Sequence, residues 1–468
     1  MTDKRDAPRV GIVGGGILGL TLALRLRQHG FDVTVFEGSP SAGGLATPPT
    51  IASYAWDGLY HPMLLSDAHL RGLLEELGID DRIRWGLTRT GFHVGGKLHA
   101  VSSIRDLLQF PSLSLIDKAR LGLTILRAAH VRDPASLETL SGADWLRRWG
   151  GRHTYAHLWL PLLKAELGAN HTKPSAAFMV AMIARMYASR RTGGGGGAAR
   201  EVCGYIHGGY PFLLDALCEH VVDLGVRIET NATVARAFDD RNSATILLKD
   251  SRVAVFDHLV VTTPAPVAAR LCPQLTDAER ARLEHVTYQG LVCMSLLLRR
   301  SLGEFYVSNI ATPGIPFTAV IEMTALVPVS TFAGHTLVYL PRHVAQDDSY
   351  WSLSDSAIRN HFLDALGTLY PQLAARDVVA SEIARVRYVL ALPTRNYSHD
   401  VRPSLETSRP RIHLVNSAQI AYGTLNVNEI VALATTQAER LAPRIAPHDV
   451  RFHTPWPAVP ASTAGSAP

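Results

Sequence analysis

The chain has 468 residues, more than one compact hydrophobic core usually serves, so two or three domains are expected. Apolar residues make up 47% of the chain and charged residues 19%, a composition that excludes a disordered protein. The formal net charge is +5, without a basic stripe interleaved with aromatic residues, which argues against nucleic acid binding. This surplus of positive charge is compatible with binding to an acidic membrane surface or to an anionic substrate. The simpler interpretation is a solvated surface without a charged partner.

The spacing of the cysteines and the character of the N-terminal residues predict the cellular compartment of the protein. The four cysteines lie far apart and form no CxxC pair, so neither a metal site nor a disulfide framework is expected. Such cysteine usage fits a reducing cytoplasm. The charged N-terminal segment runs straight into an apolar pattern and does not resemble a signal peptide. No uncharged apolar run of about eighteen residues occurs, so no transmembrane helix is expected.

A glycine motif near the N-terminus gives the strongest functional signal. An apolar pattern at residues 10–13 predicts a buried strand, and it leads into the GxGxxG spacing of Gly14, Gly16 and Gly19. A helical pattern follows, and a second predicted strand at residues 32–36 ends on Glu37. This order is that of a βαβ dinucleotide-binding unit. A glycine-rich turn without a ligand is the alternative interpretation.

Each residue type in this unit has a physical role. Gly14 allows a tight turn, Gly16 lets the backbone approach a pyrophosphate, and Gly19 permits close packing of helix and strand. The helix N-terminus can then offer its free N–H groups to phosphate oxygens. Glu37 can accept hydrogen bonds from ribose hydroxyls. The predicted cofactor-binding residues of this unit are Gly14, Gly15, Gly16, Ile17, Leu18, Gly19 and Glu37.

A second glycine pair, Gly43 and Gly44, follows Glu37 after a short spacer and precedes Leu45. With this doublet the chain resembles the FAD-binding flavoprotein superfamily that includes amine oxidases, protoporphyrinogen oxidases, phytoene desaturases and UDP-galactopyranose mutase. The resemblance extends over about residues 10–441 and implies FAD as the cofactor, with Gly43, Gly44 and Leu45 among the residues that bind it. The implied fold class is α/β: a Rossmann-like FAD-binding domain with a glutathione-reductase-like βαβ unit, interleaved with a mixed α+β substrate domain.

The resemblance also divides the chain. The FAD-binding domain is expected in three segments, residues 1–90, 201–285 and 400–445. The substrate-binding domain, a helical lobe plus a β-sheet, is expected in residues 91–200 and 286–399. A run of five glycines at residues 193–197 is interpreted as a surface loop or a lid. Residues 446–468 are rich in Pro, Ala and Ser and are expected to form a flexible tail.

Three patterns in the expected substrate domain predict local structure. Residues 92–101 read as a hairpin that turns at Gly95 and Gly96. Residues 114–131 form an amphipathic helix pattern, which indicates either a core-facing helix or, as in some resembling proteins, contact with a membrane surface. The resemblance implies a strand at residues 387–397 that packs beside the flavin.

Further cofactor contacts are implied by the resemblance. The backbone of Val234 is expected to hold the adenine end of FAD. A predicted strand at residues 412–415 leads into Asn416 and Ser417, where the superfamily commonly has Gly-Asp. Both side chains can make the same hydrogen bonds to ribityl and pyrophosphate oxygens.

A helix is predicted at residues 429–441, just after Asn426 and Asn428, which the resemblance implies bind the cofactor. In the resembling proteins such a helix directs its N-terminal N–H groups at the pyrimidine edge of the flavin, where they stabilise negative charge on reduction. A capped surface helix that binds no ligand is the alternative interpretation.

Candidate catalytic residues are less sharply indicated. The resemblance places His61 near the flavin ring, where it acts as a general base, hydrogen-bonds N5 or the substrate, or is simply a packed histidine. Tyr60, Glu322 and Tyr422 are candidates for the substrate pocket. Residues 290–298 lack the lysine that monoamine oxidases hold near N5. This absence favours dehydrogenation like that of protoporphyrinogen oxidases or desaturases over ordinary amine oxidation.

The resemblance implies an FAD-dependent oxidoreductase that transfers a hydride from a C–H or N–H bond of a small molecule to flavin N5. No second βαβ fingerprint occurs, so oxygen, a quinone or another protein is the expected electron acceptor. Two alternatives stay open: a flavin-dependent mutase similar to UDP-galactopyranose mutase, and a non-catalytic partner protein with the flavin fold. The substrate and the oligomeric state are not indicated.

Overall fold

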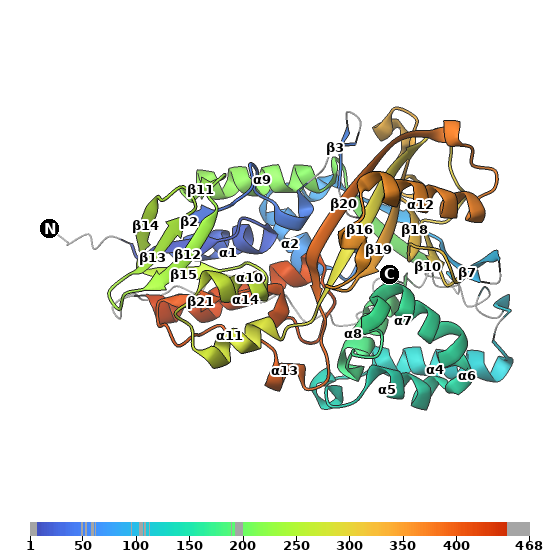
Figure 1. Cartoon of the computed structure of the whole chain (residues 1–468), viewed down its shortest axis with the longest axis horizontal. Helices are drawn as coiled ribbons and strands as arrows, with labels where there is room; N and C mark the ends of the chain where they lie inside the picture. The colour runs from blue at the N-terminus through green and yellow to red at the C-terminus, as the bar shows by residue number, and fades with distance from the viewer. Residues whose placement is uncertain are drawn as a thin grey trace, which may run out of the picture.

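The computed structural model describes residues 7–47, 50–51, 54–57, 60, 62–94, 96–102, 106, 109–111, 113–188, 190–191 and 200–446. His61, the five-glycine run and the expected tail beyond residue 446 lie outside these residues. Two parts lie side by side along the long axis in Figure 1. A parallel sheet with its covering helices forms one part, and a large mostly antiparallel sheet above a helical lobe forms the other. The proposed division of the chain into domains stays a prediction.

A five-stranded parallel sheet is the centre of the first part. Its order is β11 (Arg227–Glu229), β2 (Asp32–Phe36), β1 (Arg9–Val13), β15 (His258–Val261) and β21 (Ile412–Leu414). Because all neighbours are parallel, the carboxyl ends of the strands meet at one edge. The chain places β2 on one side of β1 and β15 on the other, so the strand order reverses at β1. Open parallel sheets bind ligands at such a reversal.

Side chains alternate between the two faces of this sheet, and each face has its own cover. Val10, Ile12, Val33 and Val35 pack in one core with four helices: α1 (Ile17–Gln28), α2 (Ala68–Glu76), α9 (Gly209–Asp223) and α14 (Val427–Ile445). Val13, Phe36, Leu259 and Val261 pack on the other face against a meander and a helix: β12 (Val234–Asp239), β13 (Ala244–Leu248), β14 (Val253–Phe256) and α10 (Ala265–Leu271). The helix α11 (Asp277–Glu284) follows α10.

A seven-stranded sheet dominates the second part. Its order is β20 (Val378–Ala391), β16 (Tyr288–Leu298), β19 (Thr336–Val344), β18 (Ala319–Glu322), β17 (Val307–Ile310), β7 (Thr90–Val94) and β8 (Lys97–Ala100). We call its inner face the one that carries Leu291, Cys293, Leu337 and Tyr339. The outer face carries Val292, Met294 and Val338, and α12 (Asp355–Leu369) packs on it.

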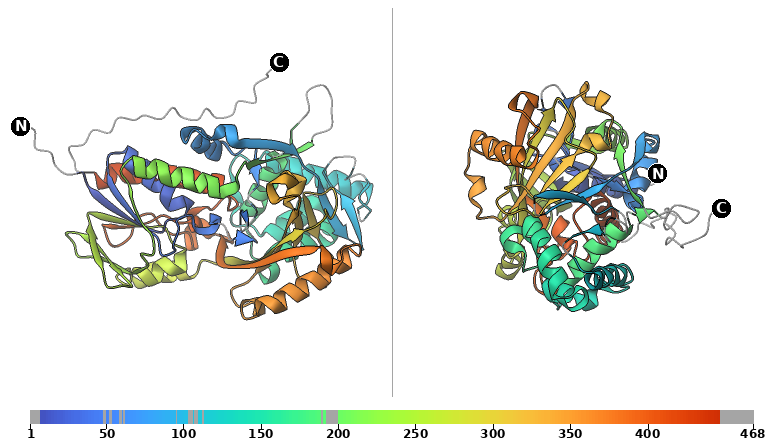
Figure 2. Two further views of the ribbon diagram at one scale, coloured as in Figure 1. Left: turned by 90° about the horizontal axis from the view of Figure 1, so that it is seen from above. Right: turned by 90° about the vertical axis from the view of Figure 1, so that its right-hand side faces the viewer.

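The helical lobe lies below this sheet in Figure 1. Its helices are α4 (Leu115–Ala129), α5 (Gly142–Gly150), α6 (Arg152–Thr154), α7 (Leu160–Leu167) and α8 (Ala176–Ala188), with a π-helical turn at Tyr155–Trp159 before α7. Figure 2 shows the lobe and the large sheet from two further sides. Smaller elements join the two parts: β5 (Met63–Leu64), β6 (Ile83–Leu87), β9 (Arg190–Arg191), β10 (Arg200–Ile206), β3 (Thr50–Ile51), β4 (Tyr54–Ala55) and α13 (Tyr397–Asp400).

The helix α4 combines a buried and an exposed apolar side. Ser114 caps it, and Leu121, Thr124 and Ala128 face the lobe. The opposite side leaves apolar side chains in contact with solvent: Leu115 is 75%, Ile116 68%, Leu123 54% and Leu126 48% exposed. The helix therefore faces the core, and contact of its exposed side with a membrane surface stays a prediction.

Most predicted elements occur, with shifted ends. The predicted hairpin is confirmed: β7 and β8 pair antiparallel around Gly96, whose φ is +76°. The strand expected at residues 387–397 is wrong in its bounds, because β20 begins at Val378 and ends at Ala391. The last helix begins at Val427, before the predicted residue 429, because the side chain of Asn426 accepts a hydrogen bond from the Glu429 N–H and caps it there.

Candidate active site

The predicted glycine loop connects β1 to α1 at the reversal of the parallel sheet. Gly14 has a φ of +115°, which side chains rarely adopt, and its N–H donates to the Phe36 carbonyl at 2.9 Å. A Cβ atom on Gly19 would lie 1.9 Å from the Gly14 carbonyl oxygen, so only glycine lets the helix start this close to the strand. Ile17 and Leu18 are buried in the core, so they offer a ligand only their backbone.

Glu37 braces this loop from the end of β2. Its Oε2 accepts a hydrogen bond from the Gly15 N–H at 2.8 Å, and its Oε1 accepts one from the Ser39 N–H at 2.8 Å. A carboxylate has about four lone-pair sites, so both oxygens can still accept from a ribose hydroxyl. The acid predicted as a ribose ligand thus also holds the glycine loop in position.

The second glycine pair lies directly against the first loop. The Gly43 N–H donates to the Gly15 carbonyl at 2.8 Å, and a Cβ atom on Gly44 would lie 3.0 Å from the Cα of Gly16. Gly43 and Gly44 have φ values of +138° and +59°. Leu45 follows and is 38% exposed. Two segments far apart in the predicted unit therefore form one backbone surface without side chains.

Val234 begins β12 beside the same loop. It is 8% exposed, and the chain just before it is tied to Glu37, since the Ala232 N–H donates to the Glu37 carbonyl at 2.8 Å. A Cβ atom on Gly38 would lie 3.0 Å from Thr233 Oγ1, so the two turns are in close contact. The structure thus places Val234 next to the end of the fingerprint that binds ribose in βαβ units.

Asn416 and Ser417 follow β21 at the same edge. Asn416 is 1% exposed, and its Oδ1 accepts from the Ala418 N–H at 3.1 Å, whereas its Nδ2 has no hydrogen-bond partner among the described residues. Thr263 Oγ1, which follows β15, also lacks a partner there. A buried polar group without a partner costs about 1–3 kcal/mol, so these groups indicate that a polar ligand completes this edge.

The two C-terminal asparagines have different roles. Asn426 caps α14, whose free N-terminal N–H groups can stabilise negative charge. Asn428 is 6% exposed, and its Oδ1 accepts from the N–H groups of His69 at 2.9 Å and Leu70 at 3.1 Å. That oxygen caps α2, so Asn428 fixes α2 to α14 and has no acceptor left for the cofactor on Oδ1.

A cavity of about 370 Å³ opens between this region and the helical lobe. Its walls come from α4, α8 and the segment before α14, and include Ala128, Ala181, Ala184, Arg185, Tyr422 and Glu429. The Tyr422 hydroxyl lies 2.9 Å from Ser398 Oγ and donates to Glu138 Oε2 at 3.4 Å. Tyr422 therefore lies in the wall of this cavity, and its role in a substrate pocket stays a prediction. The volume is within the range of small-molecule sites.

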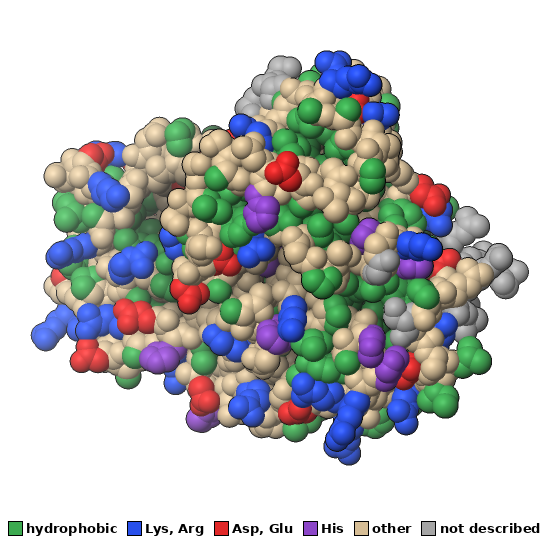
Figure 3. Space-filling model, turned by 45° about the vertical axis from the view of Figure 1, so that its right-hand side comes forward, with side chains coloured by type: hydrophobic (Ala, Val, Ile, Leu, Met, Phe, Trp, Pro, Cys, Tyr) green, Lys and Arg blue, Asp and Glu red, His purple; other side chains and the backbone are tan. Residues whose placement is uncertain are grey.

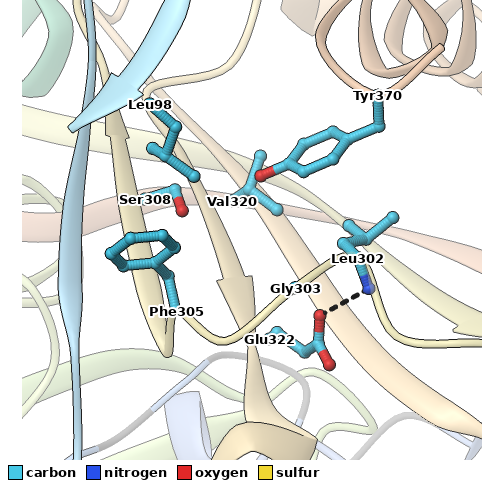
Figure 4. Close-up of a pocket in the computed structure, with 8 residues that line it drawn as sticks. All are labelled: Leu98, Leu302, Gly303, Phe305, Ser308, Val320, Glu322 and Tyr370. Carbon is cyan, nitrogen blue, oxygen red and sulfur yellow. Dashed lines mark hydrogen bonds between the residues drawn. The ribbon is translucent and has the colours of Figure 1, made fainter. Parts of the chain in front are cut away.

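Glu322 does not join Tyr422 or Tyr60. It is 4% exposed and lies with Val320 toward the outer face of the large sheet, at a small pocket shown in Figure 4. Its Oε2 accepts from the Leu302 N–H at 2.9 Å, and burial raises the pKa of its carboxyl. The prediction that it shares a substrate pocket with Tyr60 is wrong, because strand side chains alternate and Ile321, not Glu322, faces inward.

Tyr60 packs at the inner face, beside a cluster that includes Trp56 and Tyr339. Burial, and then the charge of Glu166, raises the pKa of Tyr60. Sequence reasoning missed Asp57 in the same segment, which is 6% exposed. Its Oδ1 accepts from the Tyr210 N–H at 2.7 Å and so braces the start of α9, and burial raises its pKa to about 7. A charged residue in an otherwise largely apolar segment was the sequence signal that could have identified Asp57.

Asp57→Asn is expected to increase stability at neutral and alkaline pH. The folded protein binds the proton of Asp57 more tightly than the unfolded chain, so the stability of the wild type falls as pH rises from about 4 to about 7 and then levels. Asparagine keeps an acceptor for the Tyr210 N–H without the buried charge. Melting curves between pH 5 and 9 should show a gain that grows up to about pH 7 and then stays constant, on the order of 4 kcal/mol at most. Parallel curves for the two proteins would contradict this.

Charge, metal and membrane features add little to this site. Within the described ranges, no group of three His, Cys, Asp or Glu side chains is arranged to hold a metal ion. None of the helices in those ranges has the length and apolarity needed to cross a bilayer. Figure 3 shows basic and acidic side chains interspersed over one face of the molecule.

The residues at the carboxyl edge fit FAD. Two glycine segments without side chains lie there, together with Glu37 at the ribose position. Asn416 and Thr263 add donors that have no partner among the described residues, and the capped N-terminus of α14 lies at the same edge. Backbone N–H groups and a helix N-terminus bind phosphate, and the glycines leave room for close approach. The geometry thus suits a dinucleotide, and the cavity opens beside the N-terminus of α14 at the same edge.

Comparisons with known proteins agree with this geometry. The chain is 27% identical over 177 residues to mitochondrial protoporphyrinogen oxidase of Nicotiana tabacum, covering 36% of this chain and 34% of that protein. It is 26% identical over 313 residues to coproporphyrinogen III oxidase of Mycobacterium leprae, covering 62% of this chain and 67% of that protein. The solved structure of reduced UDP-galactopyranose mutase has the same fold, with a TM-score of 0.70, 14% identity and coverage of 94% and 98%.

The matched region therefore spans between a third and two thirds of these curated relatives. A family model described as flavin-containing amine oxidoreductase matches residues 19–441, which is most of the chain and extends from within α1 to within α14. This match shows that the chain belongs to the flavin-containing amine oxidoreductase family, and the glycine loops at the sheet edge fit its FAD cofactor.

Proposed function

We propose that this protein dehydrogenates a small molecule, transferring a hydride from a substrate C–H or N–H bond to FAD, in the manner of its protoporphyrinogen oxidase-like relatives. The observation that carries the proposal is the cavity that opens beside the N-terminus of α14, at the edge where the FAD-binding segments converge. FAD supplies the hydride acceptor when bound. Oxygen, a quinone or another protein is the proposed final electron acceptor.

The protein's own residues would bind and orient the two ligands. Backbone groups of the loop from Gly14 to Gly19, together with Glu37, would hold the adenosine and phosphate part, and Asn416 the ribityl part. The walls of α4 and α8 are rich in alanine, so they present small apolar side chains to the cavity without filling it. Tyr422 and Thr424 offer hydroxyl groups that can orient a substrate.

The charges of the cavity narrow the proposed substrate class. Among the described lining residues, the charged side chains are Arg185 and Glu429. Arg185 is already paired with Asp67 through two hydrogen bonds of 2.6 and 3.1 Å. No described cation of the lining is therefore left for a substrate carboxylate. This lining favours an uncharged dehydrogenation substrate over a tetrapyrrole that carries several carboxylates.

The test is anaerobic mixing of the purified FAD protein with candidate substrates while the flavin absorbance is recorded. The candidates are an uncharged polyene of the phytoene type, coproporphyrinogen III and protoporphyrinogen. We expect the polyene to bleach the flavin and the tetracarboxylate to do so more slowly or not at all. Fast bleaching by coproporphyrinogen III would contradict the substrate class but not the dehydrogenation.

Two other outcomes would contradict the dehydrogenation itself. Turnover that requires prior reduction with dithionite and yields an isomer would identify a mutase. A protein that is purified without FAD and cannot take it up would be a non-catalytic partner with the flavin fold. A cytoplasmic location stays a prediction, which fractionation of cells would test.

A further inference from the structure

We propose that Tyr288 is a positioning residue of the FAD site, whose hydroxyl fixes the distance between the two turns that carry the unpartnered polar groups of Thr263 and Asn416. Tyr288 begins β16 of the large sheet, so it comes from outside the nucleotide-binding unit. Its role belongs to the cofactor site and does not depend on the substrate. The bonds of one hydroxyl, the burial of its ring and the groups beside it support this role.

The Tyr288 hydroxyl holds the turn after β15. It accepts a hydrogen bond from the Ala265 N–H at 3.1 Å. Ala265 is the first residue of α10, where a backbone N–H has no partner within the helix. Because Ala265 is fully buried, water does not replace the phenol oxygen as the partner of this N–H. The place of the turn between β15 and α10 therefore depends on Tyr288.

The same hydroxyl holds the turn after β21. It forms a hydrogen bond with the side chain of Ser417, which begins the short turn Ser417–Gln419. The strands β15 and β21 are neighbours in the parallel sheet, and where they end the Val415 N–H donates to the Val261 carbonyl at 3.0 Å. Tyr288 therefore bridges the turns that leave two adjacent strands at the carboxyl edge of the sheet.

The groups beside these two bonds belong to the cofactor edge. Thr262 Oγ1 donates to the Gly14 carbonyl at 3.1 Å, so the first turn contacts the glycine loop. Thr263 Oγ1 and Asn416 Nδ2 lack a hydrogen-bond partner among the described residues, and each lies within two residues of a group that Tyr288 binds. The separation of these two donors is thus set by the hydroxyl that joins their turns.

The Tyr288 ring has a fixed place. It is 2% exposed, and it packs edge-on against Tyr388 with 5.3 Å between the ring centroids. Its backbone is held in the large sheet, where it lies opposite Ala391 of β20. Burial raises the pKa of Tyr288 to about 12, so the hydroxyl stays protonated at neutral pH. A buried, neutral and immobile hydroxyl can position two turns without adding charge beside the cofactor.

A second buried tyrosine, Tyr397, provides a matched control. Its side chain is fully buried, and its hydroxyl donates to the Ala418 carbonyl at 2.7 Å. It therefore supports the turn after β21, as Tyr288 does, but no bond of its hydroxyl to the turn after β15 occurs in the described part of the chain. Replacing Tyr397 by phenylalanine removes a buried hydrogen bond from the same turn without releasing the other turn.

The first experiment measures the Kd of FAD, from the flavin fluorescence released when the FAD protein is diluted well below its unfolding temperature. We expect Tyr288→Phe to raise the Kd about 10-fold, because both turns are released and the donors of Thr263 and Asn416 no longer hold their separation. Tyr397→Phe should raise the Kd less than about 3-fold. Tyr388→Phe, which alters the ring packed against Tyr288, should leave the Kd unchanged.

A Kd that rises no more in Tyr288→Phe than in Tyr397→Phe overturns the proposal, because the hydroxyl would then support only the fold. The second experiment is a double-mutant cycle of Tyr288→Phe with Ser417→Ala. Since both changes break the same bond, their combined effect on log Kd should be smaller than the sum of the two single effects. Additive effects contradict the bridge. If Tyr288→Phe does not fold, an unchanged Kd in Ser417→Ala overturns the proposal.

Discussion

Gly19→Ala is expected to yield a protein that is less stable and retains little FAD. The added Cβ atom would lie 1.9 Å from the Gly14 carbonyl oxygen, a backbone atom that cannot rotate away. The helix α1 must then move from β1, which disrupts the loop that offers N–H groups to the phosphates. Overpacking in a core costs about 1–3 kcal/mol, and this contact belongs at the upper end. Chemical denaturation and the ratio of FAD to protein after purification measure both effects.

The matched control is Gly72→Ala. Gly72 lies in the middle of α2, and a Cβ atom there would meet nothing within 4 Å. Alanine loses less conformational freedom than glycine on folding, so this variant should gain about 0.5–1 kcal/mol and keep its FAD. Full FAD occupancy in Gly19→Ala would show that the fingerprint does not contact the cofactor.

Arg185→Met is expected to destabilise the fold by about 3–5 kcal/mol. Arg185 of α8 holds Asp67 through two hydrogen bonds, and the Asp67 side chain is only 2% exposed. Asp67 lies at the N-cap position of α2, but its carboxylate does not cap the helix: it accepts from the Leu64 N–H at 2.8 Å and pairs with Arg185. Removing the guanidinium leaves a buried carboxylate without its counter-charge. The free energy of unfolding measured in urea gives the loss.

The double variant Arg185→Met, Asp67→Asn separates charge from packing. Because asparagine removes the uncompensated charge, the double variant should be more stable than Arg185→Met alone. Arg280→Met is a control for loss of an ion pair at the surface: its partner Asp277 is 95% exposed, so the cost should stay below about 1 kcal/mol. Equal losses in Arg185→Met and Arg280→Met would show that the buried pair has no special role.

The sequence by itself determined the nucleotide-binding unit. The glycines, the two strands and Glu37 lie close together in the chain, so their spacing reflects contacts that the local backbone makes. The doublet of Gly43 and Gly44 could be predicted for the same reason. It follows after a short spacer, and the Gly43 N–H donates to the Gly15 carbonyl. Local signals also located the hairpin at Gly96, where a turn connects adjacent strands.

Only the tertiary structure decided which side chains share a pocket. A strand alternates its side chains between two faces, and the sequence does not state which face is which until the pairing register is known. Glu322 therefore fell on the outer face, while Tyr60 lies at the inner one. Asn428 was assigned to the cofactor, but the approach of α2 gave its oxygen another role.

The contacts of Asp67 with Arg185 and of His343 with Glu166 show the same limit. Arg185 and Glu166 belong to the helical lobe, and nothing local in the chain connects them to their partners. Their proximity follows from how the lobe packs on the two sheets, which depends on the shape and burial of many residues at once. The sequence thus specified a dinucleotide-binding unit through local backbone chemistry, and the packing of distant elements specified the cavity and its charges.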